Sequence, residues 1–405
     1  MTVFASSNFI TLAATKEITA NYGTVTGSAA MQYMPNTGVT LKYSKETMQS
    51  NTIDQTRQLN DLIDTGFQVS GGFGYEFAPQ MYDMFLEGAM WKEWTTATDV
   101  TIVGTTAQVA RTLTAASSTP FANVVAGQYV RVTGFVNSAN NGVFKVLTRT
   151  DTVLTFDTVY TGLVGEASVA GIKVKGSMLR NPALPSDSVR TSYFFEKALA
   201  DLDPVQRFGY GGNLINSMSL SVQSKAIVTG SLDFLGAGST AYTTATQSTG
   251  AIVAAPVKDI FNSLSHIGSM RINGIVANGA GVYFQGFDFS IGHSLRGISA
   301  VSNLGNVGVS PGTITVTGSM SPFFAAQTMY DRFINSTAFH LSFEMINQTT
   351  GEGYVFSFPR IKINDDDVGG SGKDQDVIEN ISWTALKDTT YSTTMQIDRF
   401  LTSYV

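Results

Sequence analysis

Two stretches of this chain repeat one another at a spacing of about 248 residues, and this repeat constrains the fold more than any other feature. Apolar and polar positions keep the same phase in each match. The matched segments, first copy then second, are 38–42 and 286–290, 67–71 and 314–318, and 81–85 and 329–333. Self-similarity at a fixed spacing indicates a duplicated structural unit. We therefore expect two related units in one chain.

The spacing between matched segments becomes shorter further along the chain. Residues 193–195 resemble 354–356, and residues 216–219 resemble 379–382, at a spacing of about 162. The difference predicts that the first copy carries roughly 85 residues that the second copy lacks. The expected division is a first unit at 1–95 and 176–250, an inserted domain at 96–175, and a second unit at 251–405.

The inserted segment is predicted to be a small all-β domain. It contains short apolar runs at 128–132, 142–146 and 152–156, and Asn141-Gly142 supplies the residues of a tight hairpin turn. Either a barrel or a sandwich would satisfy this pattern.

Each unit is predicted to be mainly β with one flanking helix. Phe67, Val69 and Phe73 alternate with polar or small residues, as in a strand with one solvated face. The same alternation marks further strands near 39–46, 217–220 and 231–234, and in the second unit at 287–291, 314–320, 378–385 and 393–400. Pro79 and Pro322 open segments with apolar residues at helical spacing, which predicts one helix per unit against the apolar side of the sheet.

The residue types present argue against catalysis and metal binding. The 405 residues include no cysteine and three histidines, none of which has the spacing of a zinc motif. The acidic run at 364–370 lacks the ligand spacing of a calcium loop, and residues 369–374 lack the spacing of a phosphate loop. No nucleophile motif or supported triad occurs. We predict no enzyme activity, no metal and no cofactor.

Charge and hydropathy favour a soluble protein that does not bind DNA tightly. The net charge is −6 and the pI is near 5.1, so the surface as a whole does not attract nucleic acid. Residues 1–16 lack a secretory pattern, and no stretch approaches the roughly 18 apolar residues of a membrane span.

Three stretches of the first unit resemble a known family. They are YSKETMQSN at 43–51, the strand ending VSGGFGYEF at 69–77, and MYDMFLEGAM followed by WKEW at 81–94. Together they resemble the major tail tube protein of bacteriophages with long, non-contractile tails, the siphophages. The likeness is clearest over residues 30–94 and weaker in the second unit. The inserted segment, with ANNGVFKV at 139–146, resembles small domains that decorate such proteins.

The resemblance implies a structural virion protein that assembles with itself. In that family, rings of six sandwich-like units share one barrel, and the rings stack into a tube through which DNA is ejected. Two fused units per chain would reach pseudo-sixfold symmetry as a trimer, and true rings of six chains are the alternative. Expected partners are further copies of this chain, other tail proteins at the tube ends, and viral double-stranded DNA in transit. Assembly would take place in the host cytoplasm.

The polar strand faces are predicted to line the lumen. Their Ser, Thr and Gln side chains and scattered carboxylates would let DNA slide, whereas a wall rich in Lys and Arg would bind DNA through counterion release. Lys42 departs from this pattern, and the neighbouring Glu46 would offset it. The candidate lumen residues are Lys42, Ser44, Glu46, Gln68, Ser70, Glu76, Ser219, Asp288, Ser290, Thr315, Thr317, Ser382, Gln396 and Asp398.

The family comparison also suggests contacts between stacked rings at two acidic loops, which contain Asp201 and Asp203 in the first unit and Asp365, Asp366 and Asp367 in the second. The inserted domain is expected on the tube exterior, because it would be hard to fit inside a DNA-sized channel. Its deletion should then preserve assembly.

The residues leave a second structural role open. An extracellular or baseplate β-protein could use the inserted domain to bind a receptor or a carbohydrate. Exposed aromatic residues clustered on that domain would favour this alternative, whereas long tubes in the electron microscope would favour a tail tube.

Overall fold

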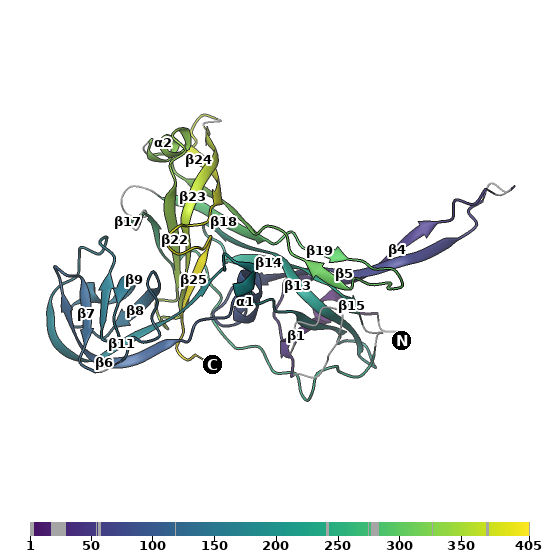
Figure 1. The fold of residues 1–405 in the computed structure, drawn as a ribbon, viewed down its shortest axis with the longest axis horizontal. Coiled ribbons are helices and arrows are strands. Elements are labelled where there is room, and N and C mark those ends of the chain that lie inside the picture. The colour runs from purple at the N-terminus through teal and green to yellow at the C-terminus, as the bar shows by residue number, and fades with distance from the viewer. Residues whose placement is uncertain are drawn as a thin grey trace.

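The computed structural model describes residues 4–17, 30–53, 55, 58–117, 119–239, 243–273, 275–276, 283–325, 327–369 and 372–404. The fold is mainly β, as predicted. Figure 1 shows an elongated molecule with a small barrel at one end, packed sheets in the middle and a long two-stranded hairpin at the other end. Residues 370 and 371 of the glycine-rich turn lie outside the described residues.

Outside the inserted segment, the described residues of the first half form ten strands and one α-helix. They are β1 (Ile10–Lys16), β2 (Gln32–Tyr33), β3 (Gly38–Val39), β4 (Lys42–Gln49), β5 (Leu62–Glu76), α1 (Asp83–Met90), the end of β11 (Glu166–Arg180), β12 (Tyr193–Leu199), β13 (Gln206–Gln223), β14 (Thr229–Gly236) and β15 (Gly238–Ser239). Between α1 and β12 lie β6 (Thr98–Ala107), β7 (Thr112–Ala115), β8 (Tyr129–Thr133), β9 (Gly142–Arg149), β10 (Val153–Phe156) and the start of β11.

The second half continues with β16 to β25 and a second helix. They are β16 (Ile267–Ile272), β17 (Ile275–Val276), β18 (Phe284–Gly292), β19 (Arg296–Ile298), β20 (Gly308–Ser310), β21 (Thr315–Pro322), α2 (Thr328–Ile334), β22 (Phe339–Ile346), β23 (Gly353–Gly369), β24 (Ile378–Ala385) and β25 (Gln396–Phe400).

One antiparallel sheet runs through both halves of the chain. Its strand order is β4, β5, β14, β13, β18, β21, β24 and β23, with β3 paired to β5 beside β4. The halves meet where β13 pairs with β18, and there Ser219 lies opposite Ser290. We call this eight-stranded arrangement the main sheet.

A second layer covers one face of the main sheet. It consists of β2, β1, β12 and the start of β13 in the first half, and of β17, β16, β22 and the start of β23 in the second. Strand β25 extends this layer by pairing with β23 and with the end of β11. Aromatic rings fill the space between the layers, including Phe73, Phe85, Phe195, Phe234, Phe287, Phe343, Phe358 and Trp383. Burial of these rings holds the layers together.

The order of strand pairing is the same in the two halves. The sequence β4-β5-β14-β13-β12-β1-β2 is matched by β18-β21-β24-β23-β22-β16-β17, and a helix follows β5 and β21. The pairing corrects part of the sequence alignment, because β12 corresponds to β22 and not to residues 354–356 in β23. The first half therefore carries about 100 additional residues rather than 85. The fourth strand of the second half is β23, since residues 393–400 contribute β25 to the second layer.

Strands β6 to β11 close into a barrel. Each strand pairs with two neighbours, in the order β11, β6, β7, β10, β9 and β8 and then back to β11. The barrel has its own core, in which Leu113, Val130, Val146, Leu154 and Val174 are fully buried. Closure leaves no unpaired strand edge among the described residues of the barrel.

The two helices differ in burial. In α1, Phe85, Leu86, Ala89 and Met90 are buried, whereas Met329 is the buried residue of α2. The second helix begins at Thr328, so the expectation that Pro322 opens it is wrong. That proline ends β21, where it pairs with Phe284 at the edge of the strand register.

Candidate functional surface

Small polar side chains line the face of the main sheet that the second layer leaves open. Two rows cross the strands, with each residue opposite the next. One row is Ser231, Ser219, Ser290, Thr317 and Thr384, and the other is Glu76, Thr229, Ser221, Asp288, Ser319 and Ser382. Because side chains alternate along a strand, the intervening Leu220, Leu232 and Phe289 point into the core. We call this surface the polar face.

Hydrogen bonds join neighbouring side chains of the polar face. The hydroxyls of Ser219 and Ser231 lie 2.8 Å apart. The Asp288 carboxylate accepts from Gln223 Nε2 at 3.0 Å and from the Ser319 hydroxyl at 3.3 Å. These groups are therefore partly satisfied within the wall, which lowers their gain from binding a passing molecule.

Most residues predicted for this surface lie on it. Ser219, Asp288, Ser290, Thr315, Thr317 and Ser382 occupy its centre, and β4 and β5 extend it with Lys42, Ser44, Glu46, Gln68, Ser70 and Glu76. The alternation at 217–220 and 231–234 placed Ser217, Ser231 and Asp233 on a polar strand face, but the candidate lumen residues omitted them, together with Ser221, Ser319, Lys362 and Thr384. Exposure of this face to a lumen stays a prediction.

The prediction that Gln396 and Asp398 line the lumen is wrong. Both lie in the second layer, where Asp398 is 0% and Gln396 2% exposed. The Asp398 carboxylate accepts from the Tyr129 backbone N–H at 3.1 Å and from Gln396 Nε2 at 2.6 Å. Gln396 Nε2 also donates to the Gly127 carbonyl, and Gln396 Oε1 accepts from Arg180. Burial raises the pKa of Asp398 to about 7, against the opposing effects of the Gln396 hydrogen bond and the Arg180 charge.

Further contacts fix the barrel against the second half. The Tyr129 hydroxyl donates to Ser342 at 3.2 Å. Arg271 lies over the Tyr160 ring and forms an ion pair with Glu344 at 3.0 Å. Around Tyr129 an apolar cluster crosses the junction and contains Val143, Ile346, Val355 and Phe400. The barrel is therefore docked on the second layer, on the side away from the polar face.

The acidic residues 365–367 do not form a loop, contrary to prediction. They lie in β23, where Asp365 is opposite Ser382 and Asp366 is opposite Ile381. A bulge at Asn364 shifts the alternation, so Asp365 and Asp367 face the polar side and Asp366 is buried. Asp201 and Asp203 do lie in a loop, between β12 and β13, and the matching loop of the second half is 347–352.

Asp366 lies beside Glu379 on the buried side of β23 and β24. Burial and the adjacent Asp366 carboxyl raise the pKa of Glu379 to about 8. The raised pKa favours the protonated form of Glu379 at neutral pH.

A family model for phage tail tube proteins matches residues 8–385. The chain belongs to the phage tail tube protein family. The match spans both halves and the barrel, well beyond the stretches that carry the resemblance in the sequence. No curated protein sequence matched the chain. Membership makes the protein a structural component of the virion tail that assembles with itself into a tube.

Two features of the described residues bear on other roles of this tail tube protein. No group of three His, Asp or Glu side chains in this part of the chain could hold a metal ion. No helix there is long and apolar enough to cross a membrane.

Acidic residues outnumber basic ones on the polar face of this tail tube protein. Within the described strands the bases are Lys42 and Lys362, and the acids are Glu46, Glu76, Asp233, Asp288, Asp365 and Asp367. A surface of this charge repels phosphate groups and offers few partners for counterion release.

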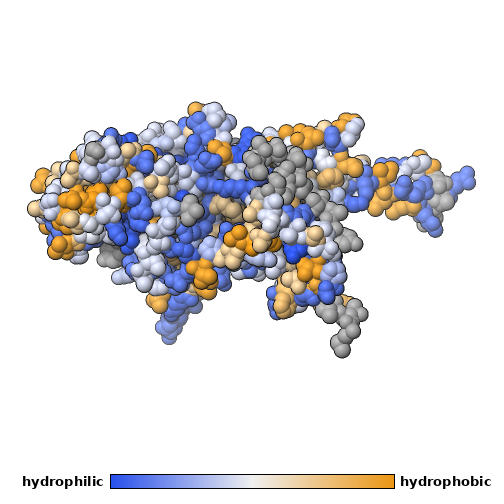
Figure 2. Space-filling model, turned by 90° about the horizontal axis from the view of Figure 1, so that it is seen from below, coloured by the Kyte–Doolittle hydropathy of each residue, from blue (hydrophilic) through white to orange (hydrophobic). Residues whose placement is uncertain are grey.

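Strands β4 and β5 continue beyond the main sheet as a two-stranded arm. Figure 2 shows hydrophobic residues along this arm, at the right of the molecule. The exposed apolar residues include Ile53, at 99%, with Met48, Leu59, Leu62 and Ile63. An isolated two-stranded hairpin is marginally stable in water, and exposed apolar side chains of this density mark an interaction site.

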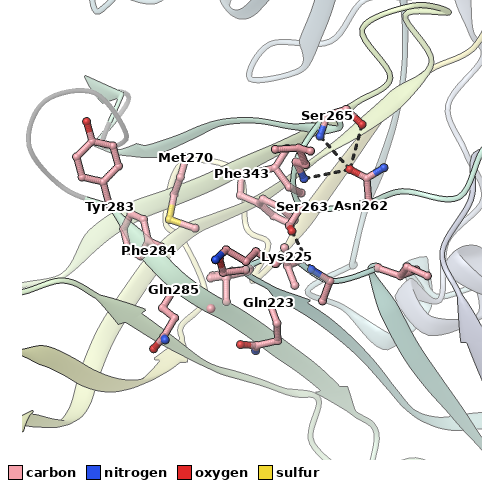
Figure 3. A pocket seen from close by; sticks show the side chains of 18 residues that line it. Gln223, Lys225, Asn262, Ser263, Ser265, Met270, Tyr283, Phe284, Gln285 and Phe343 are labelled. Atoms are coloured by element: carbon pink, nitrogen blue, oxygen red, sulfur yellow. Dashed lines mark hydrogen bonds between the residues drawn. The ribbon is translucent and has the colours of Figure 1, made fainter. Parts of the chain in front are cut away.

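An apolar groove lies where β13 ends and β18 begins. Its volume is about 760 Å³, and Figure 3 shows that its lining includes Met270, Phe284 and Phe343 together with the polar Gln223 and Lys225. Strand β5 begins in the arm at Leu62 and ends at Glu76. Glu76 lies in the same row of the polar face as Ser221 and Asp288, which are next to the groove. The arm and the groove therefore lie at opposite ends of the main sheet.

Proposed function

We propose that three copies of this chain close into a ring with pseudo-sixfold symmetry, and that stacked rings form the tail tube of a siphophage. The chain would be two fused tube units with the barrel inserted in the first. The observation that carries this proposal is the main sheet, in which two halves with the same strand order share one polar face. Assembly would take place in the host cytoplasm.

The strand count supports three chains per ring. With eight strands per chain, three chains give a barrel of 24 strands. At a spacing of ~4.8 Å and a tilt of ~40°, opposing backbones would be about 50 Å apart. Six chains would separate them by about 100 Å on the same geometry. Small side chains such as Ser219 and Ser290 leave most of the smaller width free for a DNA duplex.

The chemistry of the polar face supports a conduit for DNA ejection. Serine and threonine hydroxyls that bond one another, with scattered carboxylates such as Asp288, give phosphates little to bind. DNA would then slide along the wall without specific binding. Since the barrel docks on the second layer, a lumen at the polar face would place the barrel on the tube exterior.

Stacking would use the arm and the groove. Because they lie at opposite ends of the main sheet, the arm of one ring would meet the groove of the next in a head-to-tail contact that repeats without limit. The exposed arm residues Ile53 and Leu59 are apolar, as is most of the lining of the groove. Other tail proteins would cap the tube by occupying the arm or the groove of the terminal rings.

Electron cryomicroscopy of the purified assembly tests the proposal. We expect tubes with three chains per ring, about 50 Å between opposing backbones of the inner wall, and a decorated exterior. Rings of six chains would refute the trimer but keep the tube. A monomer that forms no tubes at high concentration would refute the assembly as a whole.

A further inference from the structure

The main sheet ends at two unpaired edges. Within the described residues, β4 pairs only with β5, and residues 362–369 of β23 pair only with β24. Open edges of this kind are templates for pairing with another chain. We propose that β4 of one copy pairs with the distal part of β23 in the next copy, antiparallel, with Lys42 opposite Asp367 and Ser44 opposite Asp365. This inference rests on the proposed ring and fixes which residues meet in it.

The junction between the two halves supplies the register. In the repeated strand order, β13 corresponds to β23 and β18 corresponds to β4. Within the chain, β13 and β18 already pair antiparallel, so the contact between copies is the same junction formed between the end of one chain and the start of the next.

The correspondence can be set residue by residue. Ile215 and Ile363 lie opposite Phe234 and Trp383, and each is followed by a bulged asparagine, Asn216 or Asn364. Ser219 of β13 therefore corresponds to Asp367 of β23.

The other strand is placed in the same way. Lys42 lies opposite Ser70 of β5, and Ser290 lies opposite Thr317 of β21. Ser70 and Thr317 correspond to one another, because the sequence repeat aligns residues 67–71 with residues 314–318. Lys42 therefore corresponds to Ser290. Because Ser219 is opposite Ser290 within the chain, Asp367 would be opposite Lys42 between copies.

The residues brought together by this register are complementary. The Ser219 and Ser290 pair inside the chain becomes an Asp367 and Lys42 pair between copies, and opposite charges facing one another across strands are favourable. Lys42 and Asp367 are both exposed, and neither takes part in an ion pair within the described residues.

On the buried side of the junction, the residue pair within the chain also differs from the corresponding pair between copies. Inside the chain Met218 lies opposite Ile291, and both are buried. The corresponding pair between copies is Asp366 and Tyr43, where a phenol hydroxyl can donate to a carboxylate. A register shifted by one residue would instead place Lys42 against the buried side of β23.

The unequal burial of the two helices fits the same junction. Next to α1, the second half of the chain covers the helix end, where His293 Nε2 lies 2.8 Å from the Ala89 carbonyl and its ring stacks on Trp91. The matching side of α2 is open, with Tyr330 and Ile334 exposed. The next copy would cover α2 as the second half covers α1.

Cysteine cross-linking tests the register, because the chain has no cysteine of its own. Four double variants combine Lys42→Cys or Ser44→Cys with Asp365→Cys or Asp367→Cys. Directly opposite residues have Cα atoms about 5 Å apart, within disulfide reach, whereas a shift of two residues separates them by about 8 Å. Seven strand spacings, about 33 Å along the sheet, separate the two edges within one chain, so a disulfide must join different copies.

We expect oxidised assemblies of the 42–367 and 44–365 pairs to run as covalent oligomers on denaturing gels. The 42–365 and 44–367 pairs, made from the same four cysteines, should give at least about tenfold less. Equal or stronger cross-linking of the latter pairs, or no cross-link in any pair although tubes are seen by microscopy, would overturn the register and leave the tube standing. Unsubstituted chains that form no rings would instead refute the proposed function itself.

Discussion

Replacement of Asp83 by alanine should destabilise the subunit far more than the same change at Asp331, although both occupy the same place in the repeated MYD motif. Asp83 begins α1 and is almost buried. Its Oδ2 accepts from Arg399 at 2.6 Å, and its Oδ1 accepts from the Tyr354 hydroxyl at 2.5 Å. Arg399 also lies over the Trp94 ring, 4.2 Å from its centre. These contacts join the helix of the first half to β23 and β25.

The magnitude follows from what alanine leaves behind. The side chains of the Asp83–Arg399 ion pair are 13% and 12% exposed, so removing the carboxylate leaves a buried guanidinium without its counter-charge and the Tyr354 O–H without its acceptor. Breaking a buried pair of this kind costs about 3–5 kcal/mol. Asp331 is exposed, and its replacement should change stability by no more than about 0.5 kcal/mol.

Urea unfolding of the unassembled subunit, followed by tryptophan fluorescence, measures both variants. A double variant with Arg399→Met should lose less than the sum of the single losses, because neither charge is then left alone. A cost below about 1 kcal/mol for Asp83→Ala, or an equal cost for Asp331→Ala, would refute the reasoning.

Four further predictions concern assembly, pH and the wall. Lys42→Asp and Asp367→Lys should each slow tube formation by light scattering, and the double variant should recover it; failure to recover would contradict the proposed pairing. Because folding keeps a proton on Glu379 that the unfolded chain releases, the stability of the subunit should fall as pH rises from about 4.5 to about 8, by up to ~1.4 kcal/mol per pH unit, and Glu379→Gln should flatten this slope in urea titrations. Asp288→Lys should make tubes retain DNA at low salt in a filter assay, whereas Asp151→Lys on the barrel should not. Deleting residues 98–174 should lower the melting temperature of the subunit, because Asp398 and Phe400 lose their cover, and an unchanged value would show that the docking adds nothing.

The polar face could be predicted because it depends on local alternation. Ser290 and Thr317 lie on the opposite face of the sheet from their neighbours Phe289 and Val316, because successive side chains of a strand point to opposite faces. Duplication was also visible, because matched strands kept the same phase. These signals are short in range, so a single sequence carries them.

The errors arose where a distant segment decides the outcome. Gln396 and Asp398 alternate like residues of an open strand, but the barrel buries them with its own Gly127 and Tyr129. Residues 365–367 have the composition of a solvated loop, yet pairing with β24 overrides the weak strand preference of aspartate. The local sequence of either segment does not indicate which distant segment packs against it or pairs with it.

The two versions of the junction explain why a duplicated sheet has diverged at its edges. Inside the chain, Met218 and Ile291 meet permanently, so an apolar contact can seal the junction. Before assembly, the corresponding positions hold Tyr43, which is exposed on one edge, and Asp366, which lies on the buried side of the other edge. Charges on an edge strand discourage pairing with wrong partners, and here Lys42 on one edge and Asp367 on the other would also select the right one. The same positions would therefore keep the subunit soluble alone and join it to the next copy in a single register.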